Sequence, residues 1–175
     1  MLFQRSSRPL IGLDITTSSI KLIELSRSGD GYRVESYAAE PSPPNAINEK
    51  AIVDSQAVGE AVRRAVKRAG ARSKDCAVAI SGDAAITKVI QMPRNLRDAE
   101  LESQVEMQAD QYIPFPMEEV SFDFEVIGPS EKDPEMLDVL LVATRSENVE
   151  QRQAAVNAAG LATRIVDVEA FALEN

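Results

Sequence analysis

A short polar stretch between two apolar segments, DITTSSIK from Asp14 to Lys21, is the part of the sequence best suited to chemistry. A tight turn between antiparallel strands presents successive backbone N–H groups that can bind an anion. The hydroxyl groups would add hydrogen-bond donors, the lysine a point charge, and the aspartate a carboxylate for hydrated Mg²⁺. A plain hairpin turn explains the same residues, and composition alone favours it, because Asp, Thr and Ser are common in turns. The candidate phosphate and magnesium ligands are Asp14, Thr16, Thr17, Ser18, Ser19 and Lys21, with Asp14 holding the metal through water.

The overall composition narrows the chemistry further. The 175 residues include no histidine, which excludes nucleophile–histidine pairs and imidazole metal sites. The net charge of −9 gives no electrostatic basis for binding nucleic acid. The single cysteine, Cys76, lies in the apolar run DCAVAIS, so we expect a buried, inert thiol in a reducing compartment. No segment approaches the ~20 apolar residues that span a bilayer, so we expect no direct membrane insertion.

The elements that must hold the DITTSS turn can be predicted from hydrophobic periodicity. Alternation predicts an opening meander of three antiparallel strands, over residues 9–16, 20–26 and 32–39. Residues 40–50 hold three prolines and are predicted to be an irregular connection. A helix capped by Asp54 or Ser55 follows, ending at Gly70, and residues 75–81 form the next strand.

A second block of elements interrupts this first sheet. Strands are predicted over 86–92, 120–127 and 137–144, with one helix capped by Asp98 and another that begins at Ser146 and ends at Gly160. We expect residues 84–161 to form a small inserted lobe. Residues 1–83 and 162–175 would then form the first lobe, with strands on both sides of the insertion in one α/β sheet.

The last residues begin a helix at Glu169. Phe171, Ala172 and Leu173 start an apolar pattern that has only about two turns in which to develop, and isolated helices of that length are marginal. We therefore expect the chain to be part of a longer protein.

The order of these elements, together with IGLDITTSSIKLIEL from Ile11 to Leu25, resembles the phosphate-binding hairpin that opens the actin/Hsp70/hexokinase superfamily. The insertion resembles that of the FtsA group. Four segments, ITKVIQMP, EMQADQYIPFPMEEVSFDFEVIG, DVLLVATR and RIVDVEAFAL, are similar to the PilM family of the type IV pilus inner-membrane platform. This resemblance covers nearly the whole chain. It implies an actin-like (ribonuclease H-like) α/β first lobe with an inserted small α+β lobe of the FtsA/PilM type, and it favours a phosphate site over a plain turn.

The same resemblance implies a function. Proteins of this kind are scaffolds that hold ATP and Mg between two actin-type halves, with weak ATPase activity at most. They dock the cytoplasmic N-terminal tail of the membrane protein PilN in a groove between the first and inserted lobes. This links the pilus platform to the motor ATPases, and it implies a cytoplasmic protein recruited to the inner membrane through a partner. Because the second phosphate loop of such folds lies beyond this chain, we expect the chain itself to bind nucleotide weakly or not at all and to have no enzymatic activity.

The candidate groove is centred on the stiff apolar stretch Ile113-Pro114-Phe115-Pro116. Prolines fix the backbone there, and methionine suits adaptable peptide surfaces. The alternative is that Phe115 and Tyr112 belong to the core of the inserted lobe, and the residues alone leave both interpretations open. The candidate groove residues are Met92, Met107, Ile113, Phe115 and Met117.

Two other functions are compatible with the hairpin. One is an FtsA-like cell-division actin, which shares the insertion. The other is part of a small-molecule kinase of the actin superfamily, which would need acidic residues from both halves of the protein.

Overall fold

The computed structural model describes residues 10–174, so Pro9 of the first predicted strand lies outside the described residues. The chain forms two compact units. The first unit contains the described residues up to Ser81 together with those from Glu150 onward, and the inserted unit is residues 82–149. Each unit is described separately below.

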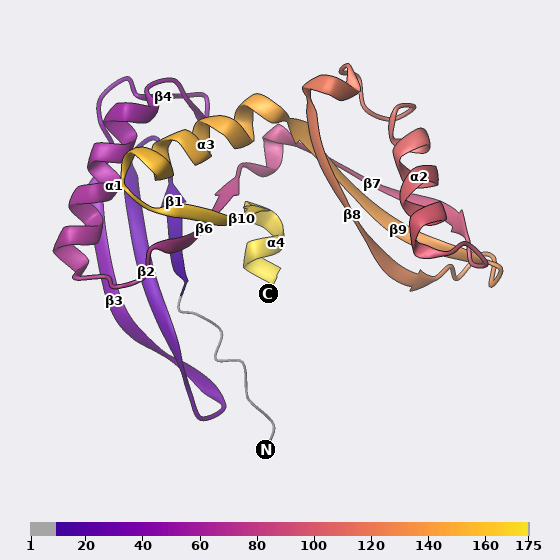
Figure 1. The fold of residues 1–175 in the computed structure, drawn as a ribbon, viewed down its shortest axis with the longest axis horizontal. Coiled ribbons are helices and arrows are strands. Elements are labelled where there is room, and N and C mark those ends of the chain that lie inside the picture. The colour runs from indigo at the N-terminus through magenta and orange to yellow at the C-terminus, as the bar shows by residue number, and fades with distance from the viewer. Residues whose placement is uncertain (1–9, 175) are drawn as a thin grey trace. The chain divides into compact units, whose positions relative to one another are not determined.

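The first unit is built on a five-stranded mixed sheet with strand order β10-β6-β1-β2-β3 (Figure 1). The first three strands form the predicted antiparallel meander, and β6 and β10 complete the sheet in parallel with β1. The strands are β1 (Ile11–Ile15), β2 (Ser19–Ser28), β3 (Gly31–Pro41), β6 (Asp75–Ile80) and β10 (Ala162–Val168).

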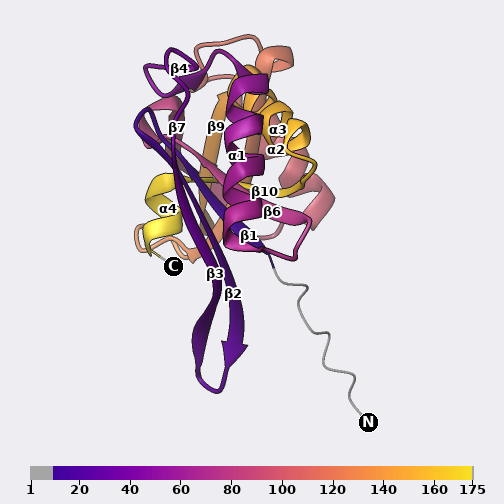
Figure 2. The same ribbon diagram turned by 90° about the vertical axis from the view of Figure 1, so that its left-hand side faces the viewer.

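Strict alternation gives this sheet one buried face. Helix α1 (Ser55–Ala69) covers that face, and helix α3 (Ser146–Ala158) contributes its later residues to the same core. Helix α4 (Glu169–Glu174) begins on the other side of the sheet, as Figure 2 shows. The buried core includes Ile11, Leu13, Ile20, Leu22, Val58, Val62, Cys76, Val78, Ala155 and Val156.

Helix α1 is positioned by its cap and by a glycine. The carboxylate of Asp54 accepts a hydrogen bond from the Ala57 amide at 2.9 Å, and Gly70 ends the helix with a φ of 66°, as predicted. A Cβ atom on Gly59 would lie 2.5 Å from the Cβ of Ala158 and 2.6 Å from the carbonyl oxygen of Ala155. The helices α1 and α3 therefore approach so closely that only glycine fits at position 59.

A buried carboxylate joins the middle of the sheet to the segment after α1. The side chain of Glu24, in β2, accepts hydrogen bonds from the Ser36 hydroxyl at 3.0 Å and from the amides of Arg72 and Ser73 at 3.2 and 3.0 Å. Burial acts to raise the pKa of Glu24, but these hydrogen bonds outweigh it and hold the pKa below its ordinary value. The ionised form of Glu24 is therefore part of the native structure.

The three arginine side chains of α1 also have partners. Arg68 lies 3.0 Å and Arg64 3.9 Å from carboxylate oxygens of Glu40, whose side chain is almost completely buried at the end of β3. Arg63 donates a hydrogen bond to the carbonyl oxygen of Ala158. These arginines hold α1 against β3 and α3.

The proline-rich connection after β3 contains structure that was not predicted. Strand β3 continues through Pro41, and β4 (Ile47–Asn48) pairs with β5 (Ala51–Ile52) in a two-stranded ribbon. The turn of this ribbon places Glu49 and Lys50 at φ values of 45° and 69°. The prediction of an irregular segment over 40–50 was therefore wrong at both ends, because non-glycine residues in left-handed conformations carry no clear turn signal.

The inserted unit is a three-stranded antiparallel sheet, β7-β9-β8, with helix α2 along one face (Figure 1). Its core is apolar and includes Ile90, Met92, Val105, Val139 and Leu141. Helix α2 begins at Asp98 but is capped one residue earlier than predicted, since the backbone amide of Arg97 donates to the Glu100 carboxylate at 3.1 Å. The elements are β7 (Ala85–Pro93), α2 (Asp98–Ala109), β8 (Val120–Pro129) and β9 (Met136–Arg145), with short 3₁₀ turns at Gly82–Ala84 and Met117–Glu119.

The boundary of the inserted unit differs from the predicted one. The predicted lobe ran to residue 161, whereas the compact unit ends at Val149. The reason is that Ala155, Val156 and Leu161 are buried in the core of the first unit. Helix α3 thus begins in one unit and ends in the other.

Candidate functional site

The turn between β1 and β2 is closed by its own hydrogen bonds. The Thr16 amide donates to the carbonyl oxygen of Ser19 at 3.0 Å, and the Thr16 hydroxyl donates to the same oxygen at 2.9 Å. The Ser19 amide in turn donates to the Thr16 hydroxyl oxygen at 3.1 Å. The Thr16 side chain is therefore occupied in shaping the turn, whereas Ser19 contributes backbone groups. Thr17 and Ser18 lie at the exposed tip, where the Ser18 hydroxyl is 3.3 Å from that of Thr16.

Asp14 and Lys21 are opposite each other at the base of this turn. The Lys21 ammonium nitrogen lies 2.9 Å from a carboxylate oxygen of Asp14, and both side chains are about half exposed, at 48% and 47%. The hydrogen bond from Lys21 to Asp14, followed by the charge of that carboxylate, raises the pKa of Lys21. The predicted point charge and the predicted metal ligand thus neutralise each other at the surface, and a bound phosphate or cation would have to rearrange this pair.

A residue far along the chain holds the turn in place. Ser42, just after β3, donates from its hydroxyl to the carbonyl oxygen of Thr16 at 2.7 Å and from its amide to that of Ser18 at 3.2 Å. Ser42 was not predicted to belong to the site. It lies in the proline-rich stretch, where nothing in the sequence distinguishes it from other turn serines.

A second carboxylate shares the sheet face of Asp14. In the register of the parallel strands, Asp167 of β10 pairs with Ala79 of β6, and Gly12 of β1 pairs with Ala77. Asp14 and Asp167 therefore lie on the same face, at the carboxyl ends of β1 and β10, separated by β6. Two strand spacings correspond to about 10 Å. Sequence reasoning treated Asp167 only as part of a family motif, because the placement of β10 beside β6 is a long-range feature.

Two of the predicted groove residues are in the core of the inserted unit. Met92 is fully buried and Ile113 is 5% exposed, and both pack in its apolar cluster. This corrects the expectation that they line a peptide surface. A lobe of this size has few apolar residues for its core, so methionine serves as core filling.

The other three groove residues are accessible to different degrees. Phe115 and Met117 are partly buried at the margin of the same cluster, and the guanidinium of Arg145 stacks 4.4 Å from the centre of the Phe115 ring. Met107 is 66% exposed, on the opposite side of α2 from the buried Val105. Phe115 therefore fits both interpretations, core residue and groove residue. It packs on the core of the inserted unit, and one face of its ring lies under the exposed guanidinium of Arg145.

Two features are absent from the described residues. None of the helices over residues 10–174 is long and apolar enough to cross a membrane. Within the same residues, no group of three or more acidic or cysteine side chains is arranged to hold a metal ion.

Comparison with solved structures defines the class of protein. Over 93% of the chain, the structure matches a chain of the PilM–PilN type IV pilus biogenesis complex with a TM-score of 0.82 and 32% identity, and it covers 48% of that chain. It also matches the cytoplasmic domain of EpsL, an inner-membrane component of the type II secretion system of Vibrio cholerae, with a TM-score of 0.58, 13% identity and coverage of 91% of this chain and 57% of that one. The fold is thus the predicted actin-like α/β fold with an inserted lobe. The chain spans about half the length of these two relatives.

The family can also be stated. Residues 12–175 match the family described as type IV pilus assembly protein PilM. The chain belongs to this family, which confirms the resemblance seen in the sequence and favours it over the cell-division and kinase alternatives.

Proposed function

We propose that the chain is an adaptor of type IV pilus assembly that binds the N-terminal cytoplasmic tail of a PilN-type membrane protein. The observation that carries this proposal is the 32% identity, over 93% of the chain, to a chain of the PilM–PilN complex. Such an adaptor works at the cytoplasmic face of the inner membrane and is held there by its partner. We include pilus motor ATPases and other platform proteins among the proposed partners of the chain.

Phe115 and Met117 are the side chains that we assign to tail binding. Both combine partial exposure with packing on the rigid core of the inserted unit, which limits the entropy lost when a peptide binds. The stacked Arg145 adds a donor next to an apolar surface. Met107 is a weaker candidate, because it projects from the solvent side of α2.

We also propose that the β1–β2 turn forms one wall of an ATP–Mg site in a complete two-lobed protein. Thr17 and Ser18 offer hydroxyl groups at the tip, and Lys21 and Asp14 supply a cation and a carboxylate. Asp167 adds a second carboxylate on the same sheet face. These donors fit a phosphate and a hydrated magnesium ion, which prefers one or two carboxylates. We expect this wall alone to bind nucleotide weakly.

Calorimetric titration with the PilN cytoplasmic tail peptide from the same organism tests the adaptor function. Binding is expected to the unaltered chain and to Tyr32→Ala, a control that removes a 73%-exposed aromatic ring from the first unit. Phe115→Ala is expected to weaken binding about tenfold, the equivalent of ~1.4 kcal/mol. Absence of binding to the unaltered chain would contradict the adaptor proposal. Full binding by a folded Phe115→Ala variant would contradict only the assigned residue.

A further inference from the structure

The sheet of the inserted unit has two edge strands, and one of them is blocked. Strand β8 has a bulge between Val126 and Gly128 and ends at Pro129. Its solvent face carries the exposed carboxylates of Asp123 and Glu125. Bulges, prolines and charges are the usual features that keep an edge strand from pairing with another chain.

The other edge, β7, has no bulge, and its proline and its lysine leave most of the edge unobstructed. It pairs with β9 over all nine of its residues without a bulge, and β9 is its only strand partner among the described residues. Its proline, Pro93, is the last residue of the strand. Lys88 lies near the middle of β7, but its ammonium group is 5.4 Å from the centre of the Tyr112 ring and so is drawn toward α2. The outer hydrogen-bonding groups of β7 are therefore regularly spaced, and no strand among the described residues pairs with them.

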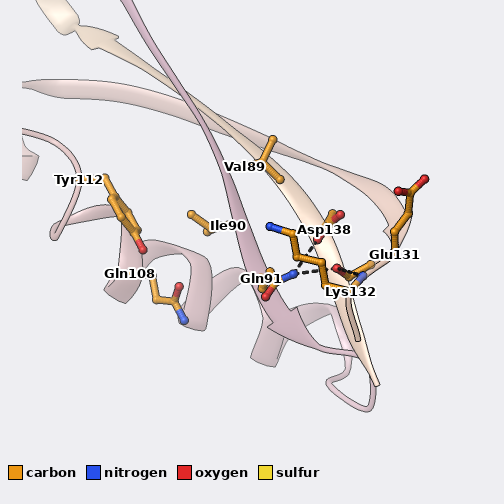
Figure 3. Close-up of a pocket in the computed structure, with 9 residues that line it drawn as sticks. Val89, Ile90, Gln91, Gln108, Tyr112, Glu131, Lys132 and Asp138 are labelled. Atoms are coloured by element: carbon orange, nitrogen blue, oxygen red, sulfur yellow. Dashed lines mark hydrogen bonds between the residues drawn. The ribbon is translucent and has the colours of Figure 1, made fainter. Parts of the chain in front are cut away.

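An open pocket of about 550 Å³ lies at Val89, Ile90 and Gln91 of this strand. Figure 3 shows Tyr112 and Gln108 of the α2 segment on one side of the β7 ribbon, and Lys132 and Asp138 on the other. An added strand at this edge would direct alternate side chains into these two sides, because successive side chains of a strand point to opposite faces. The half-exposed Val89 offers an apolar contact between them.

An acidic segment is favoured by two lysines near this edge, Lys132 in the lining of the pocket and Lys88 in β7 itself, and by the engagement or direction of the two carboxylates in the lining, Asp138 and Glu131. Gln91 donates hydrogen bonds to Ser130 at 2.7 Å and to Asp138 at 3.2 Å, which fixes the loop side of the pocket and satisfies that carboxylate. Figure 3 shows the Glu131 carboxylate directed away from Gln91. Within the described part of the chain, neither Lys88 nor Lys132 has a carboxylate partner in an ion pair.

We propose that the free edge of β7 binds an extended acidic segment of a partner protein as an additional strand of the sheet. Backbone hydrogen bonds to β7 hold the segment, carboxylates on its two faces meet Lys88 and Lys132, and a β-branched side chain packs on Val89. The site uses none of the residues assigned to the PilN tail or to nucleotide, so it stands or falls independently of the proposed function.

The probe is a short synthetic peptide of Thr, Val and Glu, compared with a peptide in which Lys replaces each Glu. Fluorescence anisotropy measures binding to the whole chain at low and high salt, and amide exchange reports which strand is protected. The acidic peptide is expected to bind, more weakly at high salt, and to slow exchange in β7 and not in β8. The double variant Lys88→Glu/Lys132→Glu is expected to bind it about tenfold less tightly and to prefer the lysine peptide. Lys74→Glu, an exposed lysine of the first unit, is the matched control and is expected to bind as the unaltered chain does.

Several results would overturn the proposal. Equal binding of the acidic and the lysine peptide would contradict the proposed preference for an acidic segment. Slower amide exchange in β8 and not in β7 would show that the peptide pairs with β8, which contradicts the proposed site. Self-association of the chain through β7, seen as a concentration-dependent sedimentation coefficient without peptide, would assign the edge to a second copy. Absence of binding by the acidic peptide would leave β7 as an ordinary protected edge.

Discussion

Each of the two units packs α-helix against a β-sheet, but the two cores place charge differently. The first unit buries Glu24, Glu40 and Arg152, and each of these side chains joins segments that are distant in sequence. The buried polar side chains that the structure describes in the inserted unit are only Ser130 and Thr144, and the rest of its core is apolar. The first unit is discontinuous along the chain, whereas the inserted unit is continuous.

This difference indicates what each kind of core requires. Hydrophobic burial is not directional, so it stabilises an inserted unit whose strands already pair through local connections. A sheet assembled from separate stretches of chain also has to fix their register. Buried charged side chains with specific hydrogen bonds can fix that register. Removal of one partner then leaves the other buried without a partner, which strongly destabilises the protein. Four predictions test the comparison, in order of decreasing effect.

The largest effect is expected from removing the buried arginine of α3. Arg152 is 2% exposed and donates to the carbonyl oxygens of Ala79 at 2.7 Å and Lys50 at 3.3 Å. Arg152→Ala leaves buried carbonyl groups without these donors and should cost about 4 kcal/mol in the free energy of unfolding. Urea denaturation measures this loss. Arg164→Ala removes an exposed arginine paired with Asp75 and should cost less than about 1 kcal/mol. Equal losses for the two variants would contradict the special role of the buried charge.

The core of the inserted unit should respond to the loss of apolar volume. Leu141 is fully buried in β9, and Leu141→Ala should destabilise the protein by about 3 kcal/mol through lost burial and a cavity. Hydrogen exchange resolved by residue should show faster exchange in β7 and β9 and little change in β1 and β2. The control is Leu173→Ala, at a position that is 88% exposed. Equal acceleration in both sheets would show that the units unfold as one.

Acid should weaken the first unit through Glu24. Because the pKa of this carboxyl is lower in the folded state than in the unfolded state, its contribution is complete above the unfolded value and is lost as the pH falls through the folded value. Glu24→Gln should cost about 2 kcal/mol at neutral pH and flatten the acid dependence of unfolding. Glu125→Gln, at an exposed position of β8, is the matched control. An acid dependence unchanged by Glu24→Gln would contradict this assignment.

The smallest effect is kinetic. Cys76 is fully buried, as predicted, and burial raises the pKa of its thiol to about 11. Alkylation by iodoacetamide at neutral pH should therefore be slow and limited by opening of the first unit. Arg152→Ala should accelerate labelling, whereas Leu141→Ala should leave it nearly unchanged. Fast labelling of the unaltered chain would contradict the burial of Cys76.

The local elements of the fold could be predicted from the sequence because their patterns are local. Alternation in β1, β2 and β6 and the stripe of Val58 and Val62 in α1 identify a buried face without knowledge of the partner element. Family resemblance supplied the actin-like arrangement, which these local patterns do not contain.

The remaining features depend on contacts that no local pattern contains. Burial of Arg152 inside α3 and the continuation of the first unit through residues 150–161 follow from packing of α3 on α1. In the candidate site, the sequence identified the residues of the β1–β2 turn. It did not predict the hydrogen bonds that these residues form with one another and with Ser42. Met92 was assigned to a surface because its flexibility suits peptides, and the same property suits a small core.

The register of β7 with β9 means that the inserted unit could be removed from the protein or transferred to another one. Ala85 and Thr144, at the two ends of the inserted sheet, are directly paired, so their Cα atoms are about 5 Å apart. A segment whose ends meet can be exchanged for a tight turn, or transplanted into a loop of another protein, without stretching either backbone. The inserted unit should therefore be exchangeable between homologous proteins at this pair of residues. Such an exchange would transfer the β7 edge and the Phe115 surface together and leave the sheet of the first unit intact.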